Sequence, residues 1–261
     1  MTREPPVLAT QDLTIRFGGH VAVDAVSCAF DRGTLTAIVG PNGAGKTTYF
    51  NLISGQLTAS AGRVHLNAED ITCLGPAARC DRGIGRAFQL TSLFPSLSVR
   101  ENVRLVVQSR ARRGFDLFSR ADSHVELTER AEHVLAEVRL SDKRDMTVSA
   151  LPHGDQRKLE VAMMIALAPQ VLMFDEPTAG MSVDEVPVIL DLIRDLKADH
   201  DRTILLVEHK MDVIRSLADR IVVLHNGALV AEGDPGEVMK MDVVQEAYLG
   251  RASVAGAEAR P

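Results

Sequence analysis

Hydrophobic and polar positions follow two different periods along this chain. Runs of apolar and β-branched residues, which predict strands, occur in two groups. They span residues 7–17, 20–30, 35–39 and 62–66, and then 171–174, 203–207, 221–224 and 229–232. Gly18-Gly19 joins the first two runs and favours a hairpin. The predicted strands therefore form two groups, separated by a long stretch of another kind.

That intervening stretch, from about residue 90 to 168, has helical spacing. Ser123-x-x-Glu126 resembles a capping box, which predicts that a helix starts there. The apolar face that follows contains Leu127, Ala131, Val134, Leu135 and Val138. A second apolar face contains Leu159, Ala162, Met163, Ala166 and Leu167. The stretch is predicted to be a helical insert.

Shorter helices are predicted beside the strands. One runs from Thr48 to Ile53, and a second covers 185–197 with Pro187 in its first turn. Another follows the 203–207 strand, and Asp70-Ile71 is expected to start a helix or a turn. Strands that alternate with helices imply a parallel sheet with helices on both faces. The sequence thus predicts an α/β fold whose core is split by the insert.

Composition narrows the functional classes. The chain has 261 residues, 46% of them hydrophobic, so it can bury a sizeable core. Its net charge of −6 argues against a general nucleic-acid binder. Cys28, Cys73 and Cys80 lack metal-ligand spacing and fit free thiols in a reducing compartment. The longest apolar run, 161–168, is too short to span a membrane, so any membrane role is expected to depend on a partner.

The clearest chemical pattern is the glycine-rich segment between the predicted strand 35–39 and the next helix. It fits G-x-x-x-x-G-K-[ST], the P-loop pattern, and comprises Gly40, Pro41, Asn42, Gly43, Ala44, Gly45, Lys46, Thr47 and Thr48. Its glycines let successive N–H groups curl around a phosphate, and the helix dipole adds to the attraction. Lys46 is expected to reach the β- and γ-phosphates, and Thr47 Oγ to hold Mg²⁺. An ordinary glycine turn is the alternative.

Two acids follow the buried strand 171–174. In a P-loop sheet the carboxyl end of such a strand lies beside the nucleotide. Asp175 is expected to orient Mg²⁺, and Glu176 to polarise the attacking water. Two acids that cap a helix or lie in solvent are the alternative interpretation.

Two further polar residues are weaker candidates. His209 follows the strand 203–207, which should neighbour the Asp175 strand, so it could reach the γ-phosphate, although a lone histidine there is usually structural. Gln89 lies where the sheet core meets the helical insert, and could sense Mg²⁺ on one side and a partner on the other. By itself, Gln89 is better explained as an exposed polar side chain.

The segment 151–157 is a second candidate for anion binding. It contains Pro152, His153, Gly154 and Asp155 and opens the second helical face. A glycine-containing turn at a helix N-terminus favours anions. A second phosphate site in one chain makes sense if it serves a nucleotide held by a second copy.

Taken in order, these segments resemble the nucleotide-binding domain of ABC transporters over roughly residues 7–250. Residues 40–48 resemble Walker A, Gln89 the Q-loop, 151–156 the signature, 174–176 Walker B with the catalytic glutamate, and His209 the switch histidine. Phe17 matches the aromatic residue that stacks on adenine, and a core phenylalanine is the alternative.

The resemblance implies a P-loop NTPase fold. Its expected parts are a RecA-like, mostly parallel sheet core, an N-terminal antiparallel β subdomain and a helical subdomain at about 90–168. Independently of the resemblance, the small and polar residues 251–261 are expected to form a disordered tail. It implies ATP and Mg²⁺ as cofactors, with Glu176, His209, Lys46 and Gln89 in catalysis. The resemblance implies that Thr47, Gln89 and Asp175 contact the metal. It also implies nucleotide contacts from Phe17, residues 40–48, Gly154 and Asp155.

More narrowly, the chain is similar to the ATPases of branched-chain amino acid importers. The carrying segments are 17–19, 87–89 with 93–99, 178–182, 207–209 and 247–250. The partners implied are a second nucleotide-binding subunit (the same chain or a paralogue), two membrane permeases and, indirectly, a solute-binding protein. The implied location is peripheral, on the cytoplasmic face of the inner membrane.

Two segments depart from the family pattern. The usual Leu-Ser-Gly-Gly-Gln becomes a segment with Pro152, His153 and Asp155, and Pro152 has neither a hydroxyl nor an N–H to offer a phosphate. The D-loop aspartate is replaced by Ser182, and Ser182-x-x-Glu185 also fits a capping box. Importers of urea or other amides, the lipopolysaccharide export ATPase and ABC ATPases without a transporter are the alternatives.

Overall fold

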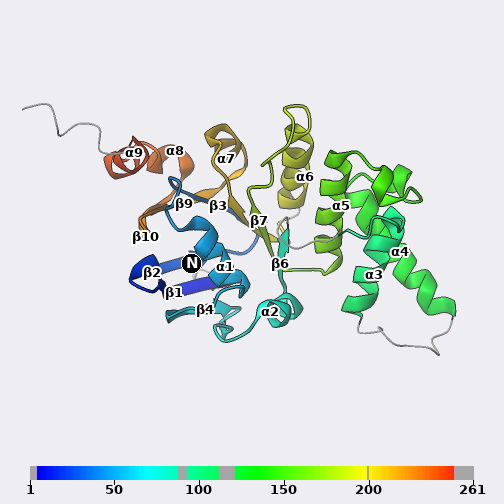
Figure 1. Cartoon of the computed structure of the whole chain (residues 1–261), viewed down its shortest axis with the longest axis horizontal. Coiled ribbons are helices and arrows are strands. Elements are labelled where there is room, and N and C mark those ends of the chain that lie inside the picture. Colours follow the sequence, from blue (N-terminus) through cyan, green and yellow to red (C-terminus); the bar gives the residue numbers. More distant parts are fainter. Residues whose placement is uncertain (1–4, 88–92, 112–120, 199, 250–261) are drawn as a thin grey trace, which may run out of the picture. The chain divides into compact units, whose positions relative to one another are not determined.

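The computed structural model describes residues 5–87, 93–111, 121–198 and 200–249. Contacts divide the chain into two compact units (Figure 1). The first contains the residues up to Cys73 and those from Leu205 onward, and the second contains Leu74–Ile204. The strand β8 (Thr203–Val207) crosses the boundary between them.

The first unit contains an antiparallel sheet near the start of the chain. Its strand order is β2-β1-β4-β5, with β1 at Leu8–Phe17, β2 at His20–Phe30, β4 at Ala61–Leu66 and β5 at Glu69–Asp70. Phe17 pairs with His20 across the predicted hairpin, where Gly18 adopts φ 57°. Asp70 ends the two-residue strand β5, which pairs with β4, and the turn expected there follows at residues 72–73, where Asp70 Oδ1 accepts from the Thr72 N–H at 2.9 Å.

A second set of strands in this unit carries the P-loop. β3 (Leu35–Val39) pairs in parallel with β9 (Arg220–His225), which pairs antiparallel with β10 (Ala228–Gly233). The helices here are α1 (Lys46–Ser54), α7 (Met211–Leu217), α8 (Pro235–Val238) and α9 (Asp242–Leu249). One buried cluster joins Val39, Val223, Val238 and Val244. The strand that leads into the P-loop is therefore packed under the C-terminal helices.

The second unit contains the other strand of chemical interest. β7 (Val171–Asp175) is buried throughout and pairs in parallel with β6 (Ile84–Ala87). α2 (Pro76–Arg82) precedes β6, and α6 (Val186–Ala198) follows β7. The parallel pairing and the flanking helices confirm the predicted α/β class.

The rest of the second unit is helical, as predicted. α3 (Val99–Arg110), α4 (Ala121–Glu137) and α5 (His153–Ala166) lie together (Figure 1), with single turns at Ser141–Lys143 and Val148–Ala150. The predicted apolar face of α4, Leu127 to Val138, is buried. Ser123 lies inside α4 rather than at its start, so the predicted capping box there is wrong. A capping interaction occurs instead at α3, where Ser98 Oγ accepts from the Glu101 N–H at 3.1 Å.

Within the residues that the structure describes, no helix is long and apolar enough to cross a membrane.

Candidate functional site

The P-loop connects β3 to α1 and is shaped by its glycines. Gly40, Gly43 and Gly45 have φ values of 148°, 80° and 95°, a region that other residues rarely adopt. A Cβ on Gly40 would lie 2.1 Å from the Leu224 carbonyl oxygen, and one on Gly45 would lie 2.5 Å from the Ala22 carbonyl oxygen. The loop therefore fits tightly against β9 and β2, and only glycine is compatible with it at these two positions.

Lys46 places a positive charge within this loop. It is the first residue of α1 and is 6% exposed. Its Nζ donates to the carbonyl oxygens of Gly40 and Pro41 at 2.8 and 2.9 Å. The exposed Thr47 follows in the first turn of α1, at the positive end of the helix dipole. The arrangement suits a polyphosphate with a bound cation.

Two other predicted residues belong to the same unit. Phe17, at the end of β1, is 50% exposed, so the alternative of a core phenylalanine is wrong and its ring has a free face for stacking. His209 follows β8 and is exposed. Its backbone N–H donates to the carboxylate of the buried Glu208 at 3.1 Å. Their roles towards a nucleotide remain predictions.

Tyr248 on α9 is a P-loop neighbour that the sequence did not reveal. Burial raises the pKa of its phenol, and a hydrogen bond from the Gly40 N–H opposes that rise. The buried Val244, one turn earlier on α9, packs in the same cluster as Val39. Helix α9 thus supports the entrance to the P-loop from the other end of the chain.

In the second unit, β7 ends in the two predicted acids. The Asp175 side chain is 5% exposed, and its Oδ2 accepts from Arg86 Nη2 at 2.7 Å. Glu176 is partly exposed and has φ 49°, a left-handed conformation that is strained for a residue with a side chain. Eight other described non-glycine residues also have a positive φ, so the catalytic role of Glu176 stays a prediction.

The signature segment opens α5 as predicted. Pro152 is the N-cap and offers no side-chain hydrogen bond to the helix. The Gly154 N–H donates to Glu185 Oε1 at 3.0 Å. A carboxylate of the same chain therefore occupies this helix N-terminus, as the helix dipole favours.

Glu185 connects this segment to the D-loop position. Its Oε2 accepts from the Ser182 N–H at 3.1 Å and from Ser182 Oγ at 3.0 Å. The first of these contacts is one half of the predicted capping box. Hydrogen bonds from Ser182 are the main cause of the lowered pKa of Glu185, and the Gly154 N–H contributes to it. The carboxylate is thus shared between the N-terminus of α5 and the turn that precedes α6.

Asp155 is held away from solvent. Its carboxylate pairs with Lys158 at 3.0 Å and with Lys143 in the turn before α5. Burial raises the pKa of Asp155, but the hydrogen bonds from the two lysines outweigh it, and the pKa is lowered overall. In this structure Asp155 therefore fixes the turn to α5.

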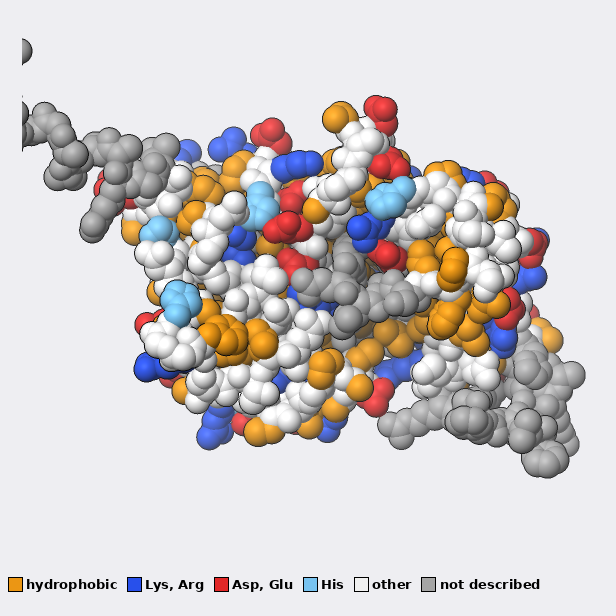
Figure 2. Space-filling model, viewed as in Figure 1, with side chains coloured by type: hydrophobic (Ala, Val, Ile, Leu, Met, Phe, Trp, Pro, Cys, Tyr) orange, Lys and Arg blue, Asp and Glu red, His pale blue; other side chains and the backbone are white. Residues whose placement is uncertain are grey.

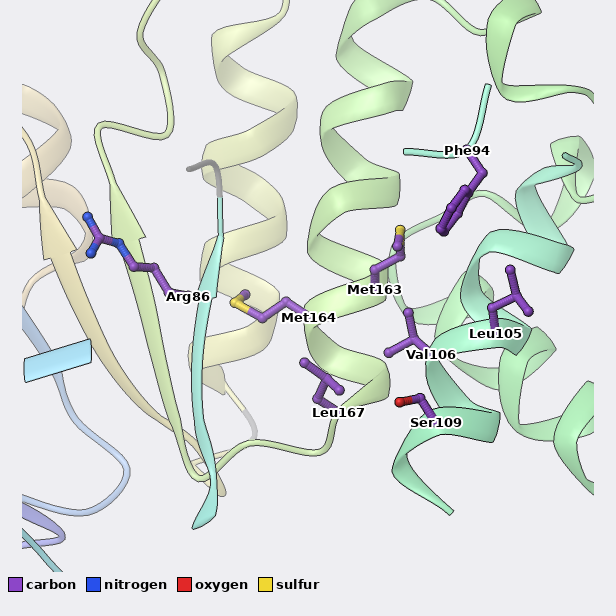
Figure 3. Close-up of a pocket in the computed structure, with 8 residues that line it drawn as sticks. All are labelled: Arg86, Phe94, Leu105, Val106, Ser109, Met163, Met164 and Leu167. Atoms are coloured by element: carbon purple, nitrogen blue, oxygen red, sulfur yellow. The ribbon is translucent and has the colours of Figure 1, made fainter. Parts of the chain in front are cut away.

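An apolar groove of about 410 Å³ lies within the second unit. Figure 3 shows its residues: Arg86, Phe94, Leu105, Val106, Ser109, Met163, Met164 and Leu167. Hydrophobic side chains also gather over α3 and α5 in Figure 2. Phe94 is 49% exposed, although it is a large aromatic residue. Gln89, predicted at this seam, lies outside the described residues.

Comparisons with known proteins agree with these features. A family model described as "ABC transporter" matches residues 23–179. The high-affinity branched-chain amino acid transport ATP-binding protein BraF of Pseudomonas aeruginosa is 35% identical, over 95% of this chain and 99% of its own. The lipopolysaccharide export system ATP-binding protein LptB of Acidithiobacillus ferridurans is 32% identical, over 94% of this chain and 97% of its own.

Among solved structures, the chain is similar to the ADP conformation of an ATP-binding cassette of an ABC transporter. The TM-score is 0.79 and the identity 29%, over 94% of this chain and 98% of the other. This similarity confirms the predicted P-loop NTPase fold.

Proposed function

The chain belongs to the ABC transporter family, and we propose that it is the ATP-hydrolysing subunit of an importer for branched-chain or related amino acids. The observation that carries the transport part is the 35% identity to BraF over nearly the full length of both chains. LptB, at 32%, supports the lipopolysaccharide exporter less well.

Nucleotide binding is assigned to the first unit. The glycine-shaped P-loop and the N-terminus of α1 would hold the phosphates, with Lys46 as their counter-charge. The exposed ring of Phe17 would stack on the adenine. The tight fit of Gly40 and Gly45 supports this assignment, because a loop so constrained keeps its N–H groups in place before the ligand arrives.

Mg²⁺ is the proposed metal. Thr47 Oγ in the first unit and the Asp175 carboxylate in the second would each offer an oxygen of the kind that this ion prefers, and the family resemblance adds Gln89. Asp175 fits the role because its buried carboxylate already requires a cation beside it, here Arg86. When bound, the ion would neutralise charge on the β- and γ-phosphates.

For hydrolysis, Glu176 would orient and polarise the attacking water, and His209 would contact the γ-phosphate. Glu176 belongs to the second unit and His209 to the first. Catalysis of this kind depends on positioning and on charge stabilisation rather than on a covalent intermediate.

The signature segment is proposed to serve the nucleotide of a second copy or of a paralogue. Because Pro152 has no N–H, the Gly154 N–H and the α5 dipole would be the attraction for the γ-phosphate. Glu185 accepts from Gly154 in the free chain, so its carboxylate would have to move aside. ATP-driven closure would then exchange one anion for another at this helix.

The apolar groove is the proposed docking site for a helix of a membrane permease. Its lining of methionine, leucine and phenylalanine suits an apolar helix face, and methionine adapts to different surfaces. Such docking would place the chain at the cytoplasmic face of the membrane, with a solute-binding protein acting through the permeases.

Isolation of the tagged chain from its native membranes tests this proposal. We expect two permeases and a solute-binding protein to co-purify, and leucine rather than urea to raise the melting temperature of that binding protein. A Phe94→Ser variant should lose the permeases, whereas Val125→Ser, which removes another exposed apolar side chain outside the groove, should keep them. A chain recovered without membrane proteins would refute the transport function.

A further inference from the structure

We propose that Arg86 competes with Mg²⁺ for Asp175 and thereby sets the magnesium concentration that the site requires. The inference rests on the proposed function, which places Mg²⁺·ATP at this carboxylate. Arg86 would act as a positioning residue that holds Asp175 before the nucleotide binds. No step of hydrolysis is assigned to its guanidinium.

The register of two neighbouring strands brings the pair together. β6 and β7 run in parallel, and Arg86 is aligned with Met173, two residues before Asp175. Figure 3 shows the Arg86 side chain extending from β6 to the side opposite the helices that line the groove. Its Nη2 reaches Asp175 Oδ2 at 2.7 Å, within the range of a charge-assisted hydrogen bond.

Burial strengthens the attraction between Arg86 and Asp175. The Arg86 and Asp175 side chains are 7% and 5% exposed, so water screens their charges weakly. An arginine guanidinium is charged at neutral pH, so this contact joins two opposite charges. A buried carboxylate without a cation nearby would be strongly destabilised.

The two cations therefore oppose each other. A Mg²⁺ ion held by Asp175, directly or through water, would have either to take the place of Arg86 at the carboxylate or to share the carboxylate with its guanidinium. Both arrangements cost free energy, from a broken charge-assisted hydrogen bond or from repulsion between like charges. Arg86 thus lowers the affinity for Mg²⁺ in either case. ATP brings negative charge with the ion, which favours their arrival together.

The test is a Mg²⁺ titration of ATP binding to the purified chain, followed by calorimetry. Arg86→Met removes the charge and keeps an apolar stem, and Arg86→Lys keeps a charge without the planar fork. Arg82→Met is the matched control, because Arg82 is exposed on the neighbouring helix α2. We expect Arg86→Met to lower the Mg²⁺ concentration for half-saturation about tenfold, which corresponds to the loss of one charged hydrogen bond.

Thermal melting provides a readout that does not depend on turnover. Without Mg²⁺, Arg86→Met should melt below the parent, and Mg²⁺·ATP should raise its melting temperature more than that of the parent or of Arg82→Met. If Arg86→Met does not fold, Arg86→Lys should show the same changes in smaller size. An unchanged or higher Mg²⁺ requirement in the folded variant would overturn the inference. A parent chain that binds no ATP at any Mg²⁺ concentration would instead refute the proposed function.

Discussion

Two helix N-termini in this chain are assigned to phosphate, and they are built differently. At α1, the anion site is formed by backbone, with glycines pressed against neighbouring carbonyl groups and Lys46 held by Gly40 and Pro41. At α5, side chains organise the site, with Glu185 on the Gly154 N–H and two lysines on Asp155. At Gly40 and Gly45 the first site has no room for a side chain, whereas the second site is proposed to exchange one anion for another.

The difference explains why the signature segment can depart from its family pattern. A site made by backbone geometry fixes the residue type where the backbone is crowded, so the glycines at Gly40 and Gly45 are retained. A site made by a helix dipole and one N–H depends less on residue type. Pro152 and Asp155 are compatible with it, provided that Glu185 can leave.

A methyl group added to a glycine of the P-loop should destabilise the fold far more than one added at the N-terminus of α5. Gly40→Ala would place its Cβ 2.1 Å from a carbonyl oxygen at φ 148°, and should cost about 3 kcal/mol or more of unfolding free energy. Gly154→Ala meets only the flexible tip of Glu185, at 3.3 Å, and should cost less than about 1 kcal/mol. Chemical denaturation of both variants measures this, and equal costs would remove the distinction.

The Glu185 carboxylate at the N-terminus of α5 should also affect ATP hydrolysis. Glu185→Gln keeps the shape of the side chain and its contact with Ser182, but removes the charge that competes with a phosphate. It should lower the ATP concentration for half-maximal hydrolysis several-fold, by the free energy of one charged hydrogen bond shared with solvent. Asp184→Asn, an equal charge change at an exposed neighbour, is the control. If both variants behave alike, Glu185 does not guard this helix.

The smallest effect is a pH dependence at Asp155. The pKa of Asp155 is lowered in the folded chain, so its ion pairs stabilise the fold above the unfolded pKa, near 3.9, and are lost as the pH falls through the folded value. Because Lys143 is one-third exposed, the contribution should be about 1 kcal/mol or less. The stability difference between parent and Asp155→Asn should therefore shrink between pH 7 and pH 3. A constant difference would exclude the ion pairs as its source.

Much of this fold could be predicted because its strands carry their own pattern. The runs at 35–39, 171–174 and 203–207 are apolar throughout, as buried strands require, and each forms a strand. β6 was missed because Gly85 and Arg86 interrupt the apolar run, and its strand structure comes from pairing with β7. α9 was missed because eight residues give a weak period.

The candidate site likewise has a part that the sequence predicts and a part that it does not. The P-loop could be predicted because its chemistry lies in the local backbone of nine consecutive residues. The contacts of Arg86 with Asp175, Glu185 with Gly154, and Tyr248 with Gly40 join residues far apart in the sequence. The fold brings such pairs together, and a single sequence contains no local signal for them.

The most direct test of the account is whether ATP joins the two kinds of phosphate site from two chains. Sedimentation of the Glu176→Gln variant with Mg²⁺·ATP measures this, with Lys46→Ala added to the same variant as the control that should lose the phosphates. We predict a dimer that forms only with ATP, either of this chain or with the second ATP-binding subunit recovered from membranes. A Glu176→Gln chain that binds ATP and stays monomeric, both alone and with the second ATP-binding subunit, would contradict the account.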